Sequence, residues 1–132
     1  PSAWRRPNVD FLDVGDRSLV EEKLVTTDLF IAPIANNFGS KIKLLDCLSH
    51  ATPFVATEEA MSGLPFISDV PRIRLDQPEP AAQTIAKLIQ EKTLLTALSQ
   101  SLRQQLSRSL EARKGDWGDV FEKVCALPVI NT

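Results

Sequence analysis

The sequence predicts an α/β protein in which helices flank a parallel sheet, and three observations support this fold class. Two apolar runs, Leu29–Ile34 and Pro53–Thr57, are typical of short buried strands. A helical pattern over Lys41–Ser49 lies between them. In the second half of the chain, the spacing of apolar residues predicts helices and no strands. We therefore expect strand–helix alternation over residues 7–75 and helices over residues 79–127, within one domain of residues 1–132.

Further elements are predicted on both sides of these two runs. Asn8–Val14 alternates apolar and polar residues, as a half-buried strand does. Asp16 is placed to cap a helix over Ser18–Val25. Phe66–Ser68 is expected to add another short strand, and Ala81–Gln90 to form a helix.

The last third of the chain carries a leucine stripe. A helix is expected over Thr93–Arg113, ended by Gly115, with a final amphipathic helix over Trp117–Cys125. Because the leucines keep a four-residue spacing and no heptad, the stripe predicts a face toward the core or across domains, and not a coiled coil. The stripe consists of Leu94, Leu98, Leu102, Leu106 and Leu110.

Composition excludes several classes of protein. With 15 basic and 17 acidic residues among 132, the chain lacks the basic surface of a nucleic-acid binder. No apolar run is long enough to span a bilayer. Cys47 and Cys125 fit no metal or redox spacing, and both are expected to be buried free thiols in a reducing, cytoplasmic compartment. His50 is the only histidine, which argues against a zinc site.

The loop from Ala35 to Ser40 is the predicted ligand site. In open parallel sheets, ligands bind beyond the carboxyl ends of strands, where a loop enters the next helix. Gly39 allows a ligand to approach the backbone closely, and Ser40 can cap the following helix. The unpaired N–H groups of the first helical turn then favour an anion.

Three charged side chains sharpen this prediction. Lys41 and Lys43 oppose the helix dipole, a cost that a bound phosphate would offset; the alternative is two solvated surface lysines. Asp46 shares a helix face with Lys43 and can accept hydrogen bonds from two sugar hydroxyls. Its alternative is a surface ion pair with Lys43.

A longer string carries a resemblance to a known family. DLFIAPIANNFGSKIKLLDCLSHATPFVATEEAMSGL, with PNVDFLDVGD before it and DWGDVFEKV near the end of the chain, resembles the donor-site region of family-four glycosyltransferases of the GT-B fold. The resemblance implies a Rossmann-like parallel sheet, specifically a partial C-terminal domain of that fold without its first strand–helix units. The matching residues are Gly39, Lys43, Asp46, Thr52, Pro53, Val55, Ala56, Thr57, Gly63 and Leu64.

The same resemblance implies a function. The full-length enzyme would transfer a hexosyl-type group from a nucleotide-sugar to an acceptor hydroxyl, without a metal or other cofactor. Asp46 would contact the ribose, and Gly39, Ser40 and Lys43 would surround the diphosphate, with Asn37 and Lys41 as additional contacts. This chain alone is then not expected to catalyse transfer. A second chain or a swapped copy would complete its sheet, and the full-length protein is expected in the cytoplasm or at a membrane surface.

Two other functions fit the sequence less closely. A degenerate, non-catalytic domain that serves as an interaction module is favoured by Phe38, where many members carry a second glutamate, and by Asp46 in place of the usual glutamate. A receiver-type domain is disfavoured because the expected acidic cluster at strand ends is lacking.

Overall fold

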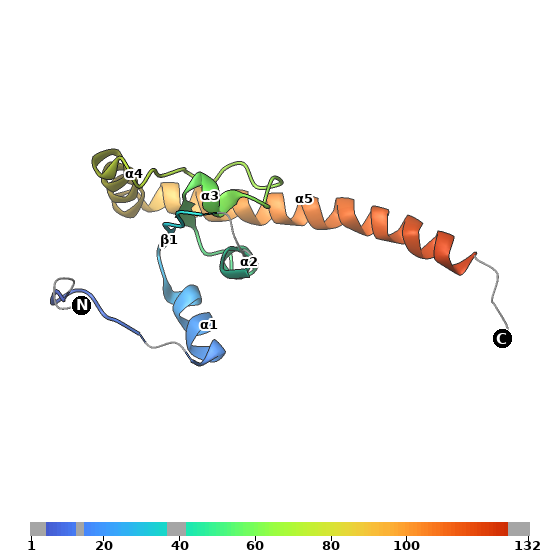
Figure 1. Ribbon diagram of the computed structural model, residues 1–132, viewed down its shortest axis with the longest axis horizontal. Coiled ribbons are helices and arrows are strands. Elements are labelled where there is room, and N and C mark those ends of the chain that lie inside the picture. Colours follow the sequence, from blue (N-terminus) through green and yellow to red (C-terminus); the bar gives the residue numbers. More distant parts are fainter. Residues whose placement is uncertain (1–4, 13–14, 37–41, 127–132) are drawn as a thin grey trace.

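Two three-residue strands, β1 (Phe30–Ala32) and β2 (Phe54–Ala56), pair in parallel in this computed structural model (Figure 1). It describes residues 5–12, 15–36 and 42–126, except for the side chains at positions 116, 117 and 121. On the far side of β2, an isolated parallel bridge joins Ala56 to Arg72. Within the described ranges β1 is therefore one edge of the sheet. The chain is a mixed α/β structure with a small parallel sheet and mostly helices.

Three of the five described helices, the first, second and fourth along the chain, begin and end close to the expected residues, whereas the third was not predicted and the fifth is longer than expected. The first two are α1 (Arg17–Thr26) and α2 (Ile42–Ser49). The backbone N–H of Ser18 donates to the Asp16 carboxylate at 2.9 Å, which confirms Asp16 as the N-cap of α1. The remaining helices are α3 (Glu58–Met61), α4 (Pro78–Gln90) and α5 (Lys92–Cys125).

Two predicted strands do not form. Asn8–Val14 was expected to be a strand, but its described part, residues 8–12, has no strand because no neighbouring strand pairs with it. Phe66–Ser68 is a turn and loop. The backbone N–H of Ser68 donates to Oε1 of Gln105 at 2.9 Å, so a side chain of α5 takes the donor that a strand partner would need.

Gly115 does not end a helix, contrary to the prediction, because α5 runs without interruption through residue 125. A glycine in a helix interior costs only about 1 kcal/mol relative to alanine, which intact turns on both sides can absorb. In Figure 1 the second half of α5 extends well beyond the rest of the chain. Cys125 lies on this part and is exposed, so its predicted burial is wrong.

The two faces of the sheet carry two hydrophobic clusters. Phe54 and Ala56 belong to the larger cluster, which includes α2 residues and Leu102 of α5. Val55 points to the opposite face and packs with Ile73 and Leu88. Helices therefore cover both faces of the sheet, as expected for a parallel sheet.

The leucine stripe of α5 faces the core over only part of its length. Leu98 and Leu102 are buried, whereas Leu110 is 50% exposed. Leu94 packs against the smaller cluster and Leu106 against the larger one, so the predicted core-facing role holds from Leu94 to Leu106.

Asp69 lies in the loop that precedes Arg72, and its carboxylate connects this loop to α5. We expect this contact to make the stability of the chain depend on pH. Hydrogen bonds, first from Ser101 and then from Gln105, lower the pKa of the Asp69 carboxyl from its ordinary value of 3.8. A lowered folded-state pKa contributes stability that is present above the unfolded pKa and is lost as pH falls through the folded value. The difference in urea midpoint between the wild type and Asp69→Asn should therefore shrink below about pH 4. A difference that stays constant down to pH 2 would contradict this account.

Candidate functional site

A cavity of about 660 Å³ lies at the carboxyl ends of the parallel strands. It sits where ligands bind in open α/β sheets. Ala35, the first residue of the predicted ligand loop, contributes to its wall. The remaining lining residues are Thr57, Glu58, Glu59, Arg72, Ile73, Arg74, Leu75 and Asp76.

Thr57 fixes the floor of this cavity. Its side chain is 2% exposed, and its Oγ1 donates to the carbonyl oxygen of Ile34 at 2.6 Å. Oγ1 of Thr57 also accepts a hydrogen bond from the backbone N–H of Ala60 at 3.2 Å, and Thr57 is thereby the N-cap of α3. One hydroxyl therefore ties the end of β2 both to the segment after β1 and to α3.

Both arginines of the cavity are paired with carboxylates. Arg72 Nε lies 3.0 Å from Glu58 Oε2, and Arg72 Nη1 donates to the carbonyl oxygen of Val70 at 2.6 Å. Arg74 holds Asp76 with two bonds, of 3.0 and 2.7 Å, and this contact raises the pKa of the Arg74 guanidinium.

The cavity has a surplus of negative charge. The side chain of Glu59 makes no hydrogen bond within the described part of the chain and acts on Arg74 through its charge. With three carboxylates and two guanidiniums in the lining, the formal sum is −1. Such a surface offers acceptors for hydroxyl groups and is a poor place for a diphosphate.

Only part of the predicted site lies within the described ranges. Asn37, Gly39, Ser40 and Lys41 lie outside the described residues, so their expected arrangement stays a prediction. Lys43 lies in the first turn of α2, and its side chain is exposed.

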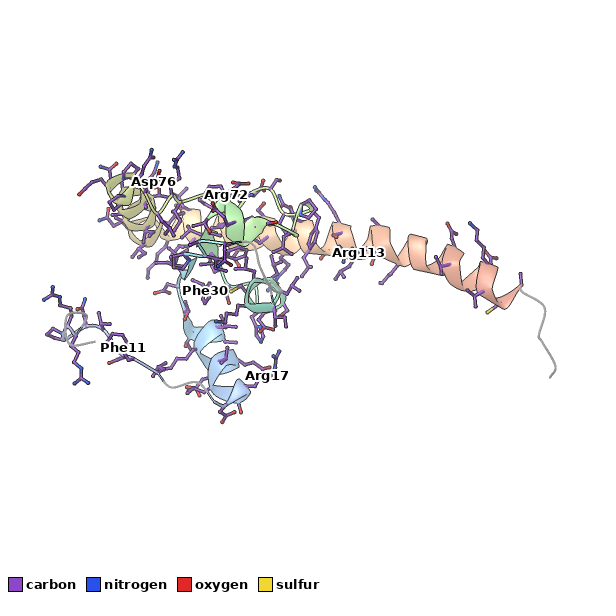
Figure 2. All side chains as sticks on the ribbon, viewed as in Figure 1. Phe11, Arg17, Phe30, Arg72, Asp76 and Arg113 are labelled. Atoms are coloured by element: carbon purple, nitrogen blue, oxygen red, sulfur yellow. The ribbon has the colours of Figure 1, made fainter. Side chains whose placement is uncertain are left out.

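Asp46 has a partner that the sequence did not indicate. Its Oδ1 lies 3.1 Å from Nη2 of Arg17 on α1, labelled in Figure 2, and its side chain is only 18% exposed. Arg17 also contacts Glu21 at 3.1 Å. Asp46, followed by Glu21, raises the pKa of the Arg17 guanidinium. No ion pair joins Asp46 to Lys43 in the described part. The surface ion pair predicted as the alternative role of Asp46 is therefore wrong, and its ion-pair partner is Arg17.

The sequence did not assign roles to the charged residues of the carboxyl-end cavity. Glu58 and Glu59 immediately follow β2, so their place at the end of a strand was a usable signal. Arg72 and Arg74 had no such signal, because the only strand-like contact nearby is the single bridge at Arg72.

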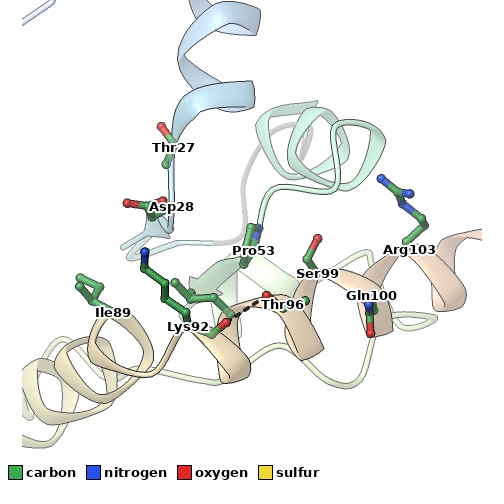
Figure 3. A pocket seen from close by; sticks show the side chains of 10 residues that line it. Thr27, Asp28, Pro53, Ile89, Lys92, Thr96, Ser99, Gln100 and Arg103 are labelled. Atoms are coloured by element: carbon green, nitrogen blue, oxygen red, sulfur yellow. Dashed lines mark hydrogen bonds between the residues drawn. The ribbon is translucent and has the colours of Figure 1, made fainter.

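A second cavity, of about 460 Å³, lies at the opposite, amino ends of the strands (Figure 3). Asp28 precedes β1 and Pro53 precedes β2, while most of the wall comes from α5, including Lys92 and Arg103. Ser99 in this wall donates to the carbonyl oxygen of Ala51 and so holds α5 against the turn before β2. We assign this cavity no ligand.

Cys47 lies beside Asp46 on α2 and is fully buried, as predicted. Burial, followed by the Asp46 charge, raises the pKa of the Cys47 thiol to about 12. Because the thiolate is the reactive form, Cys47 should resist a disulfide reagent at pH 8 while exposed Cys125 reacts. A thiol titration should count one group in the native chain and two in denaturant. Two groups reacting at equal rates in the native chain would be inconsistent with this burial.

The described residues contain no cluster of metal-ligating side chains and no helix long and apolar enough to cross a membrane. The chain matches no known protein family, no curated protein and no solved structure. Assignment of function therefore depends on the site itself.

Proposed function

We propose that this chain is the donor-binding part of a glycosyltransferase that moves a sugar from a nucleotide-sugar to an acceptor hydroxyl. The observation that carries the proposal is the cavity at the carboxyl ends of β1 and β2, whose wall includes Ala35 at the start of the predicted ligand loop. The family resemblance of the sequence between Asp28 and Leu64 gives this crevice a ligand class.

The charges favour one orientation of the donor. The diphosphate belongs at the start of α2, where the helix dipole and Lys43 are both positive. The sugar belongs toward Glu58 and Glu59, because hydroxyl groups can donate to these carboxylates. In the complete enzyme, the positive end of α2 would stabilise the departing diphosphate, which is this half's contribution to catalysis.

Calorimetric titration with uridine and guanosine diphosphates tests the proposal. Lys43→Ala should weaken nucleotide binding about 10- to 100-fold, since a hydrogen bond to a charged group contributes about 1.5–3 kcal/mol. Lys87→Ala is the control, because Lys87 is an exposed lysine in the last turn of α4. Equal affinities of the wild type and Lys43→Ala would refute the role of Lys43.

The Arg17–Asp46 contact favours a second candidate, a degenerate domain that acts as an interaction module. Arg17 contacts Oδ1 of Asp46 at 3.1 Å, and the Asp46 side chain is only 18% exposed, so fewer of its acceptor positions are open to a ribose. Arg17→Ala separates the two functions. A donor-binding domain should retain or gain nucleotide affinity when Asp46 is released, whereas a degenerate domain should bind neither nucleotide before or after the change.

A further inference from the structure

β1 has a free hydrogen-bonding edge. The backbone N–H of Phe30 donates to the carbonyl oxygen of Pro53 at 2.9 Å, and the N–H of Thr57 donates to that of Ala32 at 3.3 Å. Alternate residues of a parallel strand direct their backbone groups to opposite sides. Ile31, between Phe30 and Ala32, therefore directs its N–H and C=O away from β2. No described strand pairs with β1 on that side, and Ile31 is 40% exposed.

An apolar groove lies beside this edge. It measures about 220 Å³, and its lining consists of α1 residues with Thr27, Phe30 of β1, and Leu12 from the segment before α1. The α1 residues are Leu19, Val20, Lys23 and Leu24. Natural proteins protect strand edges with charges, bulges or covering elements, and an uncovered apolar edge invites another strand. β1 itself has only apolar residues and no charge.

The same chain offers a segment of matching pattern. Residues 8–12 alternate in the manner of a strand but pair with no strand in the described structure. Their apolar side chains are exposed, Val9 by 42% and Phe11 by 62%. Figure 2 shows Phe11 to the left of α1, apart from Phe30, which lies above that helix.

We propose that the β1 edge binds a second copy of this chain, with residues 8–12 of each copy added as a strand to β1 of the other. One contact then satisfies both unpaired features, because each copy provides an edge and receives a segment. Such an exchange is isologous and closes at two copies, so it covers both edges without forming a fibre. Residues 8–12, the described part of the predicted strand, then have a partner in the dimer.

Sedimentation equilibrium of the 132-residue chain and its variants tests the exchange. The wild type should be a dimer, whereas Ile31→Lys, which damages the edge, and Phe11→Asp, which damages the segment, should both be monomers. Val25→Lys is the matched control, since Val25 is 67% exposed on α1 and does not line the groove. Val25→Lys should remain a dimer.

Mixing the two monomeric variants gives the sharper result. The Ile31→Lys chain has an intact segment and the Phe11→Asp chain has an intact edge, so a mixture can form one sound junction. A mixed dimer should therefore appear, weaker than the wild-type dimer. Circular dichroism of each variant checks that the helices are intact.

Three results would overturn the proposal. The first is a wild type that stays monomeric over the accessible concentration range. The second is a monomer whose residues 8–12 are protected from hydrogen exchange, which means that the segment binds its own β1. The third is a dimer that survives Ile31→Lys and Phe11→Asp, since another surface must then hold it.

Discussion

Phe54→Ala is expected to destabilise the chain by about 3–5 kcal/mol, the range for removal of a large aromatic side chain from a core. Phe54 is fully buried on β2, the strand that pairs with β1 on one side and touches the Arg72 segment on the other. Domains of ordinary stability unfold at a cost of about 5–15 kcal/mol, so this change removes a large share of the total. A marked fall in the urea midpoint, read by circular dichroism, is the expected result.

Phe11→Ala provides the comparison for Phe54→Ala. Phe11 is 62% exposed, so the same substitution removes little buried area and should change stability by less than about 0.5 kcal/mol. Measurements should use dilute protein, where the proposed dimer is dissociated. Similar losses for both phenylalanines would show that burial on β2 does not set the cost.

The elements that could be predicted are those whose signal is local. The start of α1 follows from Asp16 as a capping residue, and β1 and β2 follow from short apolar runs bounded by proline or turn residues. Lys43 and Asp46 could be placed on α2 because a helical pattern fixes which residues share one helix.

The features that could not be predicted depend on residues far apart in the chain. Residues 8–12 have the pattern of a strand, but a strand needs a partner that a pattern does not provide. The contact between Asp46 and Arg17 spans 29 positions and arises from the packing of α1 beside α2. The predicted strand at Ser68 does not form because the backbone N–H of Ser68 donates to the side chain of Gln105, 37 positions away.

Gly115 shows a different limit of prediction. The residue is a good helix-ending signal, and the sequence on both sides is helical, so local pattern permits either two helices or one. The single helix α5 is what the structure has. The choice decides how far the helix continues beyond Leu110, the last member of the leucine stripe.

Leu102→Ala and Leu110→Ala form a matched pair on that stripe. Both leucines lie in α5, eight positions apart, and leucine and alanine have similar helix propensities, so only the surroundings differ. Leu102 is fully buried in the larger cluster, and its removal should cost about 2–5 kcal/mol. Leu110 is 50% exposed, and its removal should cost less than about 1 kcal/mol in urea unfolding.

The ratio of the two losses in unfolding free energy then shows whether the second half of α5 packs against other residues. A large loss at Leu102 and a small one at Leu110 means that the helix is anchored by its first half and that its remaining turns are available to a partner. Equal losses would mean that Leu110 is covered in solution by something that this structure does not contain. A concentration-dependent loss at Leu110 alone would place that cover on another copy of the chain, at a surface distinct from β1.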